Sequence, residues 1–260
     1  MCYRKLVRVL LVPIVASLCF AAIISLQVPR LNVQRQQPDK LEALRQEELE
    51  RLHLSLIKRL PTFGFKNLVG DWAFLNFIQY FGDGPVREQI GYSLSPEYFE
   101  IVVHHNPRLV NAYFYLSPAT SLFAGRPDRT VALIEKGLQS ISPKTHPKAY
   151  FLWFYKAVDE LLFLSDYKAA RRSYELAAQW ADISTDPSGK RAAARARETA
   201  QFLSKNPDSK HAHIGAWATI LSNARDEATR QIVIYNIEKL GGKVKIAPNG
   251  NLQVIVPNEK

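Results

Sequence analysis

Hydrophobic positions recur at helical spacing along most of the chain. After Asp39, six leucines follow at steps of three to five residues with charged residues between them, which is typical of an amphipathic helix. They are Leu41, Leu44, Leu49, Leu52, Leu56 and Leu60. Pro61 ends this pattern, because proline disrupts a helix interior. The same spacing, bounded by breakers and caps, predicts further helices. These cover residues 67–84, 95–104, 108–123, 127–140, 147–164, 167–181, 189–204, 209–224 and 226–240.

The segment 67–84, NLVGDWAFLNFIQYFGDG, distributes apolar and aromatic residues around nearly the whole helix circumference. A helix of that kind is usually buried. We expect it to be the leading helix of a first helix pair that closes the end of a stack, with Gly70-Asp71 and Gly82-Asp83 serving as turn and cap. A catalytic pair of Asp71 and Asp83 is disfavoured, because twelve helical residues separate them by roughly 18 Å. Paired glycosidase carboxylates need about 5 to 9.5 Å.

The amino end carries the longest apolar run. Residues 9–28, VLLVPIVASLCFAAIISLQV, hold no charge and would form a helix roughly 30 Å long, enough to cross a bilayer. Basic residues before the run favour a cytoplasmic amino terminus and a body on the far side of the membrane. We therefore expect a single-pass anchor over residues 1–30 and a linker over residues 31–38. A cleaved signal peptide in front of a soluble periplasmic binder is the alternative.

The carboxyl end changes period. Valine and isoleucine alternate with lysine from Lys243, a turn follows at Pro248-Asn249-Gly250, and alternation resumes at Leu252. This pattern predicts a β-hairpin within residues 241–260 that packs on the helices or pairs with another chain. The helical domain then covers residues 39–240.

An internal repeat organises the predicted helices. At a constant offset of forty residues, Thr130, Ile134 and Gly137 match Ala170, Tyr174 and Ala177, and Phe114 and Tyr115 match Phe154 and Tyr155. Small residues at these positions let neighbouring helices approach closely. This pattern, best developed in DYKAARRSYELAAQW at 166–180, resembles the tetratricopeptide repeat, a stack of antiparallel helix pairs. Pro118 departs from it, because proline removes a backbone hydrogen bond inside the first leading helix.

The order of GDWAFLNFIQYFGD, a helix and NPRLVNAYFYL is also similar to bacterial single-span proteins of this repeat class. The resemblance implies an all-α, helical-hairpin solenoid anchored in a bacterial membrane, with its body in the periplasm or in the lumen of internal membranes. In such repeats the leading helices line an inner groove that binds protein partners. Carried over by the offset of forty, that face contains Tyr115, Leu122, Leu152, Tyr155, Asp159 and Leu162. The alternative is that these residues touch helix 189–204.

Charge and chemistry add little. The net charge is +10, of which residues 1–30, with four bases and no acid, contribute +4. The basic segment 189–198 lacks interleaved aromatics, so we expect no nucleic-acid partner. Catalytic and cofactor motifs are absent from the sequence, and His104-His105 and His211-x-His213 have the wrong spacing for helical metal ligands. Both cysteines lie in the first twenty residues, which excludes a disulfide within the folded body.

We therefore expect a membrane-anchored scaffold for protein–protein interaction that helps assemble or retain a membrane or extracytoplasmic complex, with no catalytic residues, metal or cofactor. An extracytoplasmic small-ligand binder or enzyme is the alternative. It would use an aromatic cleft near residues 72–80, walled by Trp72 and Tyr80. A convergent set of buried polar groups in that cleft would favour the alternative.

Overall fold

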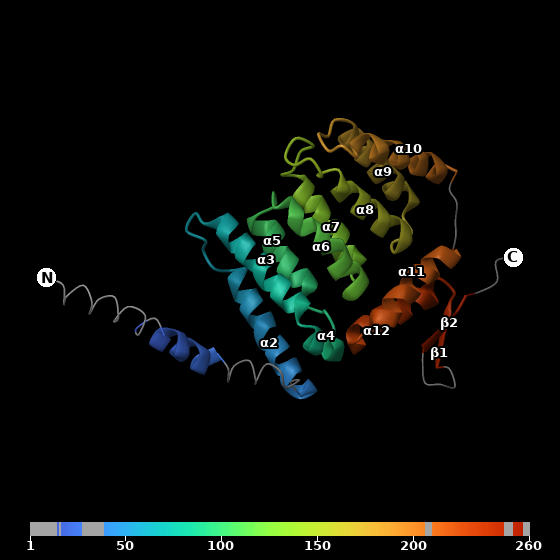
Figure 1. Ribbon diagram of the computed structural model, residues 1–260. Coiled ribbons are helices and arrows are strands. Elements are labelled where there is room, and N and C mark those ends of the chain that lie inside the picture. Colours follow the sequence, from blue (N-terminus) through green and yellow to red (C-terminus); the bar gives the residue numbers. More distant parts are fainter. Residues whose placement is uncertain (1–14, 16, 28–38, 206–209, 247–251, 257–260) are drawn as a thin grey trace. The chain divides into compact units, whose positions relative to one another are not determined.

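The computed structural model describes residues 15, 17–27, 39–205, 210–246 and 252–256 (Figure 1). The chain forms two units, Met1–Asp39 and Lys40–Lys260. In the first, residues 17–27 are helical. Residues 9–14, 16 and 28 of the predicted span lie outside the described residues, and so does the whole predicted linker 31–38. None of the described helices combines the length and the apolar character needed to cross a membrane.

The second unit is almost entirely helical, and a small antiparallel hairpin follows the last helix. The all-α prediction with a carboxyl-terminal hairpin is therefore confirmed. The helices are α2 (Lys40–Ile57), α3 (Lys66–Gly82), α4 (Gly84–Ile90), α5 (Ser95–His105), α6 (Val110–Ser117), the π-helix η1 (Pro118–Phe123), α7 (Pro127–Leu138), α8 (Phe151–Leu162), α9 (Tyr167–Asp182), α10 (Gly189–Leu203), α11 (Lys210–Asn223) and α12 (Glu227–Lys239). The strands β1 (Lys243–Ile246) and β2 (Leu252–Ile255) pair with each other.

Neighbours in the sequence are neighbours in space. Helix α3 packs on α5, α5 on α7, α7 on α8, α8 on α9 and α9 on α10, so the helices stack in chain order (Figure 1). Helices α11 and α12 pack on each other, and α11 also contacts η1 and α8. The hairpin lies against α12, as predicted, because a two-stranded sheet alone is marginal in water.

The repeat positions are buried where helices approach closely. Thr130 and Ile134 on α7 and Ala170 and Ala177 on α9 have no exposed surface. Gly137 makes the closest approach, since a Cβ there would lie 1.9 Å from the hydroxyl oxygen of Tyr113 on α6. Small residues therefore set the spacing between the helices of this stack.

A proline divides the predicted helix 108–123 into two helices of different type. The helix divides at Pro118 into α6 and the π-helix η1, because proline lacks the N–H that would continue the α-helical ladder. The short helix α4 was not predicted. Pro85 near its start and Gly91 after its end are residues typical of a loop.

The prediction for Gly70-Asp71 is wrong. Both residues lie inside α3, where Gly70 lets the end of α5 approach: a Cβ there would lie 2.7 Å from the Cβ of Asn106. Asn106 Nδ2 donates to Asp71 Oδ1 at 2.7 Å, so the pair joins two helices rather than capping one. Gly82-Asp83 does form the turn, between α3 and α4, but the Asp83 side chain makes no capping bond.

Helix α3 is also less buried than its composition predicts. One side holds Ala73 and Phe77 in the core, while Leu68, Trp72 and Leu75 on the other are 64%, 39% and 62% exposed. The helix lies at the edge of the stack, so that only one of its apolar sides finds a covering helix within the described residues.

Candidate partner-binding site

The six residues predicted to line an inner groove do not share one open face. Tyr115 and Leu122 are exposed, Tyr155 and Leu162 are partly buried, and the remaining two, Leu152 and Asp159, are buried.

The carboxyl-terminal helices account for part of this burial. Leu162 packs against the cluster that contains Ile214 and Trp217 of α11, and α11 contacts both η1 and α8. His213 of α11 fixes this position, because its ring lies 2.6 Å from the Tyr167 hydroxyl and 3.0 Å from the Leu162 carbonyl oxygen. Sequence reasoning treated α11 as one more helix of the stack and so did not foresee that it folds back.

Asp159 lies in a buried hydroxyl cluster. Ser121 donates to its Oδ2 at 2.8 Å, and Ser117 lies 3.2 Å from the same oxygen. Burial raises the pKa of Asp159 to about 7, although these hydroxyl bonds act in the opposite direction. The carboxyl group therefore joins α8 to the π-helix and is not presented to a partner.

An open hollow lies on another side of α8, between the second helices of the two repeats, α7 and α9. Its volume is about 930 Å³. Helix α8 supplies the floor through Trp153, Lys156 and Glu160. The hollow is also lined by Glu135, Leu138, Gln139, Asp166, Lys168, Ala169, Arg172, Ser173 and Leu176.

The floor of the hollow is a closed polar network. The Lys156 ammonium pairs with Glu160 and lies 3.2 Å from a carboxylate oxygen of Glu135. Ser173 donates to Glu160 at 2.6 Å and lies 3.3 Å from Lys156 Nζ. The serine proton already points at a carboxylate and the lysine is held between two anions, so the network lacks an activated nucleophile and its base.

The indole of Trp153 adds an unused donor. Its Nε1 is buried and has no hydrogen-bond partner among the described residues, while its ring lies 5.9 Å from Lys156 Nζ. The rim carries both signs of charge, with Lys168 and Arg172 on α9 facing Glu135 on α7. Such a surface can hold a segment that offers apolar contact and charges of both signs.

Comparison with known protein families, curated proteins and solved structures finds no match to this chain.

The hollow was missed at the level of sequence, although a signal existed. Lys156 and Glu160 stand four residues apart within a helix whose only other charged residue is Asp159, a spacing that places Lys156 and Glu160 on one face. A charged pair on a largely apolar helix indicates either a buried ion pair or a binding surface.

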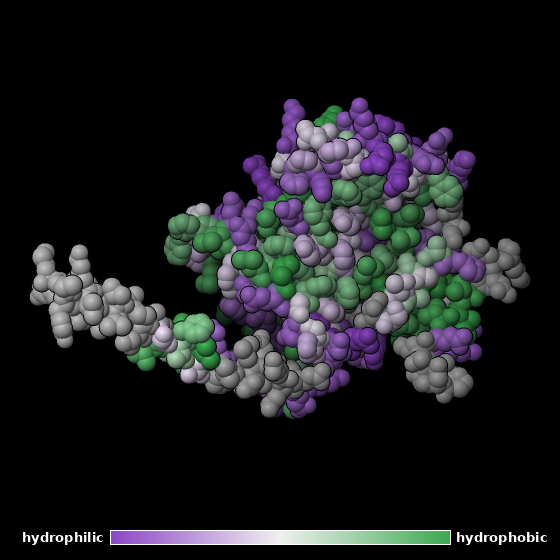
Figure 2. All heavy atoms as spheres, viewed as in Figure 1, coloured by the Kyte–Doolittle hydropathy of each residue, from purple (hydrophilic) through white to green (hydrophobic). Residues whose placement is uncertain are grey.

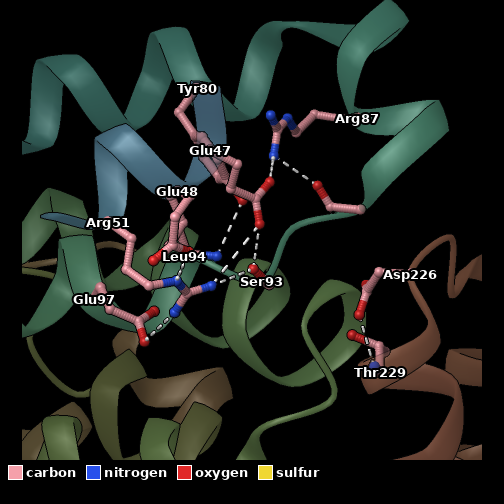
Figure 3. A network of polar contacts seen from close by, with 11 residues as sticks. Glu47, Glu48, Arg51, Tyr80, Arg87, Ser93, Leu94, Glu97, Asp226 and Thr229 are labelled. Carbon is pink, nitrogen blue, oxygen red and sulfur yellow. Dashed lines mark hydrogen bonds and ion pairs between the residues drawn. The ribbon is translucent and has the colours of Figure 1, made fainter. Parts of the chain in front are cut away.

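The aromatic cleft of the alternative function is not present between its two named walls. The Tyr80 hydroxyl accepts the Leu94 N–H at 3.1 Å, and the Arg87 guanidinium lies 4.0 Å from the Tyr80 ring centre (Figure 3). Trp72 instead lines a separate hollow of about 440 Å³ in which Thr62 is the one polar lining residue. That hollow lacks the convergent polar groups that a small-ligand site needs.

The described residues contain no group of three or more histidine, cysteine, aspartate or glutamate side chains placed to hold a metal ion.

Proposed function

We propose that this chain is a membrane-anchored helical scaffold that binds a protein partner in the hollow between α7, α8 and α9. The observation that carries the proposal is the hollow itself: it is open, has charges of both signs at its rim, and its floor is internally paired. The resemblance to tetratricopeptide repeats supports a protein partner, and the uncharged run 9–28 supports the anchor.

The lining indicates the kind of segment that fits. Trp153 and Leu138, both partly exposed, offer apolar area. Arg172 and Lys168 favour an acidic side chain near α9, and Glu135 favours a basic one near α7. An extended or helical segment of mixed charge meets all three conditions, and binding it would serve the assembly or retention of a complex at the membrane.

Site-specific photocrosslinking in intact membranes tests this proposal. A photoreactive residue at Gln139, which is exposed in the hollow, should give a discrete protein adduct that Arg172→Glu abolishes. The matched control carries the same group at Glu198, exposed on α10. An adduct that forms equally from both positions, or one that persists in the Arg172→Glu variant, would contradict binding in the hollow.

A further inference from the structure

Helix α2 turns its apolar side away from the protein. The six leucines of the predicted pattern, five in α2 and Leu60 shortly after it, are exposed by between 46% and 66% of their surface. The opposite side, which faces the body, carries Ala43, Leu54 and Ile57 together with several charged groups. A surface helix usually turns most of its leucines toward the core, whereas α2 leaves most of them exposed and turns the partly buried Glu47, Glu50 and Arg51 toward the body.

Ion pairs hold α2 in this orientation. The guanidinium of Arg87, only 5% exposed, lies 3.0 Å from Glu47 and also donates to the Gly91 carbonyl oxygen at 2.7 Å (Figure 3). Arg51 donates to Ser93 at 3.0 Å. These partners come from α4 and the turn after it, so that rotating the leucines inward would leave buried charges unpaired.

The exposed apolar surface continues around the turn into α3. The segment KRLPTFGFKNL, residues 58–68, contains three basic residues and no acid. Phe63 is 85% exposed and Phe65 66% exposed, and Phe63 adopts a positive φ of 46°, which is unusual for a bulky residue. Figure 2 shows this tip as a hydrophobic projection at the left of the helical unit.

A basic hollow of about 420 Å³ lies beside the tip. Lys58, Arg129 and Lys136 line it against a single acid, Glu100, which pairs with the first two. His105 also lines it; the side chain is 6% exposed and neither ring nitrogen has a hydrogen-bond partner among the described residues. Burial lowers the pKa of His105, and the neighbouring cations lower it further, as expected in a region of positive potential.

The lipid bilayer fits this surface better than a second protein does. Aromatic tips between basic residues match the interface, where rings meet acyl chains and cations meet phosphates. The anchor also brings the membrane close. Eleven residues, 29–39, separate the apolar run from α2 and can span at most about 40 Å, whereas α2 is roughly 27 Å long. The tip at the far end of α2 is therefore within reach of the membrane that holds residues 9–28.

We propose that the α2–α3 tip docks on the lipid bilayer, with Phe63 and Phe65 in the interface and the basic hollow against phosphates of anionic lipids. This inference rests on the proposed anchor only for the nearness of the membrane. Docking would fix the orientation of the body relative to the membrane.

Fluorescence at position 63 tests the docking. The full chain, with Cys2 and Cys19 replaced by serine, carries Phe63→Cys labelled with an environment-sensitive nitrobenzoxadiazole group, in vesicles of phosphatidylcholine and phosphatidylglycerol. We expect a blue-shifted emission that spin-labelled lipids quench. The matched control is Ile183→Cys, a 60% exposed apolar residue after α9, whose label should remain in water.

Each outcome decides the proposal. Water-like emission at position 63 in protein that resists an alkaline wash overturns the docking and leaves the anchor intact. Lipid quenching at position 63 in protein that the wash removes supports the docking and contradicts the anchor. Emission that is shielded from both water and lipid, and that grows with protein density, assigns the tip to a second copy and overturns the proposal.

A charge variant tests the basic residues of the tip and of the hollow together. Lys66→Gln, in the tip segment, with Lys136→Gln, which lines the hollow, should weaken the docking equilibrium in phosphatidylglycerol vesicles by about fivefold per charge, and should have little effect in pure phosphatidylcholine. Lys190→Gln with Arg191→Gln, on exposed positions of α10, is the matched control and should change neither. Equal effects of the two double variants would contradict recognition of phosphate by these basic residues.

Discussion

Helices α2 and α10 are both amphipathic, but they face the protein with opposite sides. Helix α10 buries Ala193, Ala196 and Ala200 against α9 and exposes its arginines. Helix α2 turns the partly buried Glu47 and Arg51 toward the body beside Leu54, and exposes its other leucines. Amphipathic spacing therefore shows that a helix has two sides but does not show which side the body covers.

The two helices differ in the residues against which they pack. Alanine on α10 faces alanine on α9, so the two backbones approach closely and the long polar side chains remain outside. Helix α2 meets the buried Arg87, and an unpaired buried guanidinium would cost several kcal/mol. Keeping the buried Arg87 of α4 paired with Glu47 therefore stabilises the fold more than burying the leucines would. A polar outer side is what terminal helices of a soluble stack need, and only α10 has it.

The largest expected effect comes from removing Arg87. Arg87→Ala removes the shortest ion pair of the largely buried Glu47 and leaves it only the Ser93 hydroxyl and Arg51, 4.0 Å away, so we expect a loss of about 3 kcal/mol in the free energy of unfolding. Denaturant titration measures it, and Arg195→Ala on the exposed side of α10 should stay within about 0.5 kcal/mol. Similar losses in the two variants would show that α2 is not held by this pair.

Overpacking the alanine seam should have the next largest effect. Ala177→Leu forces extra volume between packed helices and should cost roughly 1–3 kcal/mol. The matched control is Ala194→Leu, on the exposed side of α10, which should be nearly neutral. Thermal unfolding of both variants checks the prediction, and an unchanged melting temperature for Ala177→Leu would contradict the close packing of α9.

The buried carboxyl group of Asp159 should make the free energy of unfolding depend on pH. Its folded-state pKa of about 7 exceeds the ordinary value of 3.8, so the folded protein holds an extra proton between these values. The associated stability is present below about pH 4 and is lost as the pH rises through 7, with a slope approaching 1.4 kcal/mol per pH unit in between.

Asp159→Asn should remove this slope and make the protein relatively more stable above neutrality. Urea titrations at several pH values measure the difference from the unmodified chain. Asp182→Asn, on an exposed residue, should retain the slope. A slope unchanged in Asp159→Asn would mean that another group titrates.

The smallest effect on stability is expected at the exposed leucines. Leu52→Gln removes an apolar group that no described residue covers, so the free energy of unfolding should change by no more than about 0.5 kcal/mol. A loss of 2 kcal/mol or more, as for a core leucine, would show that the leucine side is buried within the protein.

The sequence predicts the local elements well, but it predicts poorly which elements cover each side of a helix. Periodicity and caps located nearly every helix, and Asp166 caps α9 by accepting the Ala169 N–H at 2.9 Å, in agreement with its position before a helix. Pro118 stood out as a departure from the repeat pattern, although the prediction continued the helix through it to residue 123. These features depend on residues close together in the chain.

The rest depends on contacts between distant residues. Helix α4 has only seven residues, too few for periodicity to reveal it. The leucines of α2 face outward because Glu47 on its other side pairs with Arg87, which lies forty residues away in the sequence. The hollow between α7 and α9 requires the two repeats to be placed side by side, and the burial of Leu162 requires α11 to fold back. Pattern alone encodes none of these contacts.

Labelling by a water-soluble maleimide tests most directly whether the two outer sides meet different surroundings. Leu52→Cys and Arg191→Cys are introduced separately into the full chain lacking Cys2 and Cys19, and each is labelled in intact membranes and after denaturation. We predict that both react equally when unfolded, but that the Leu52→Cys variant reacts far more slowly in the membrane. Equal rates in the membrane would contradict the proposed difference in surroundings between the outer sides of α2 and α10.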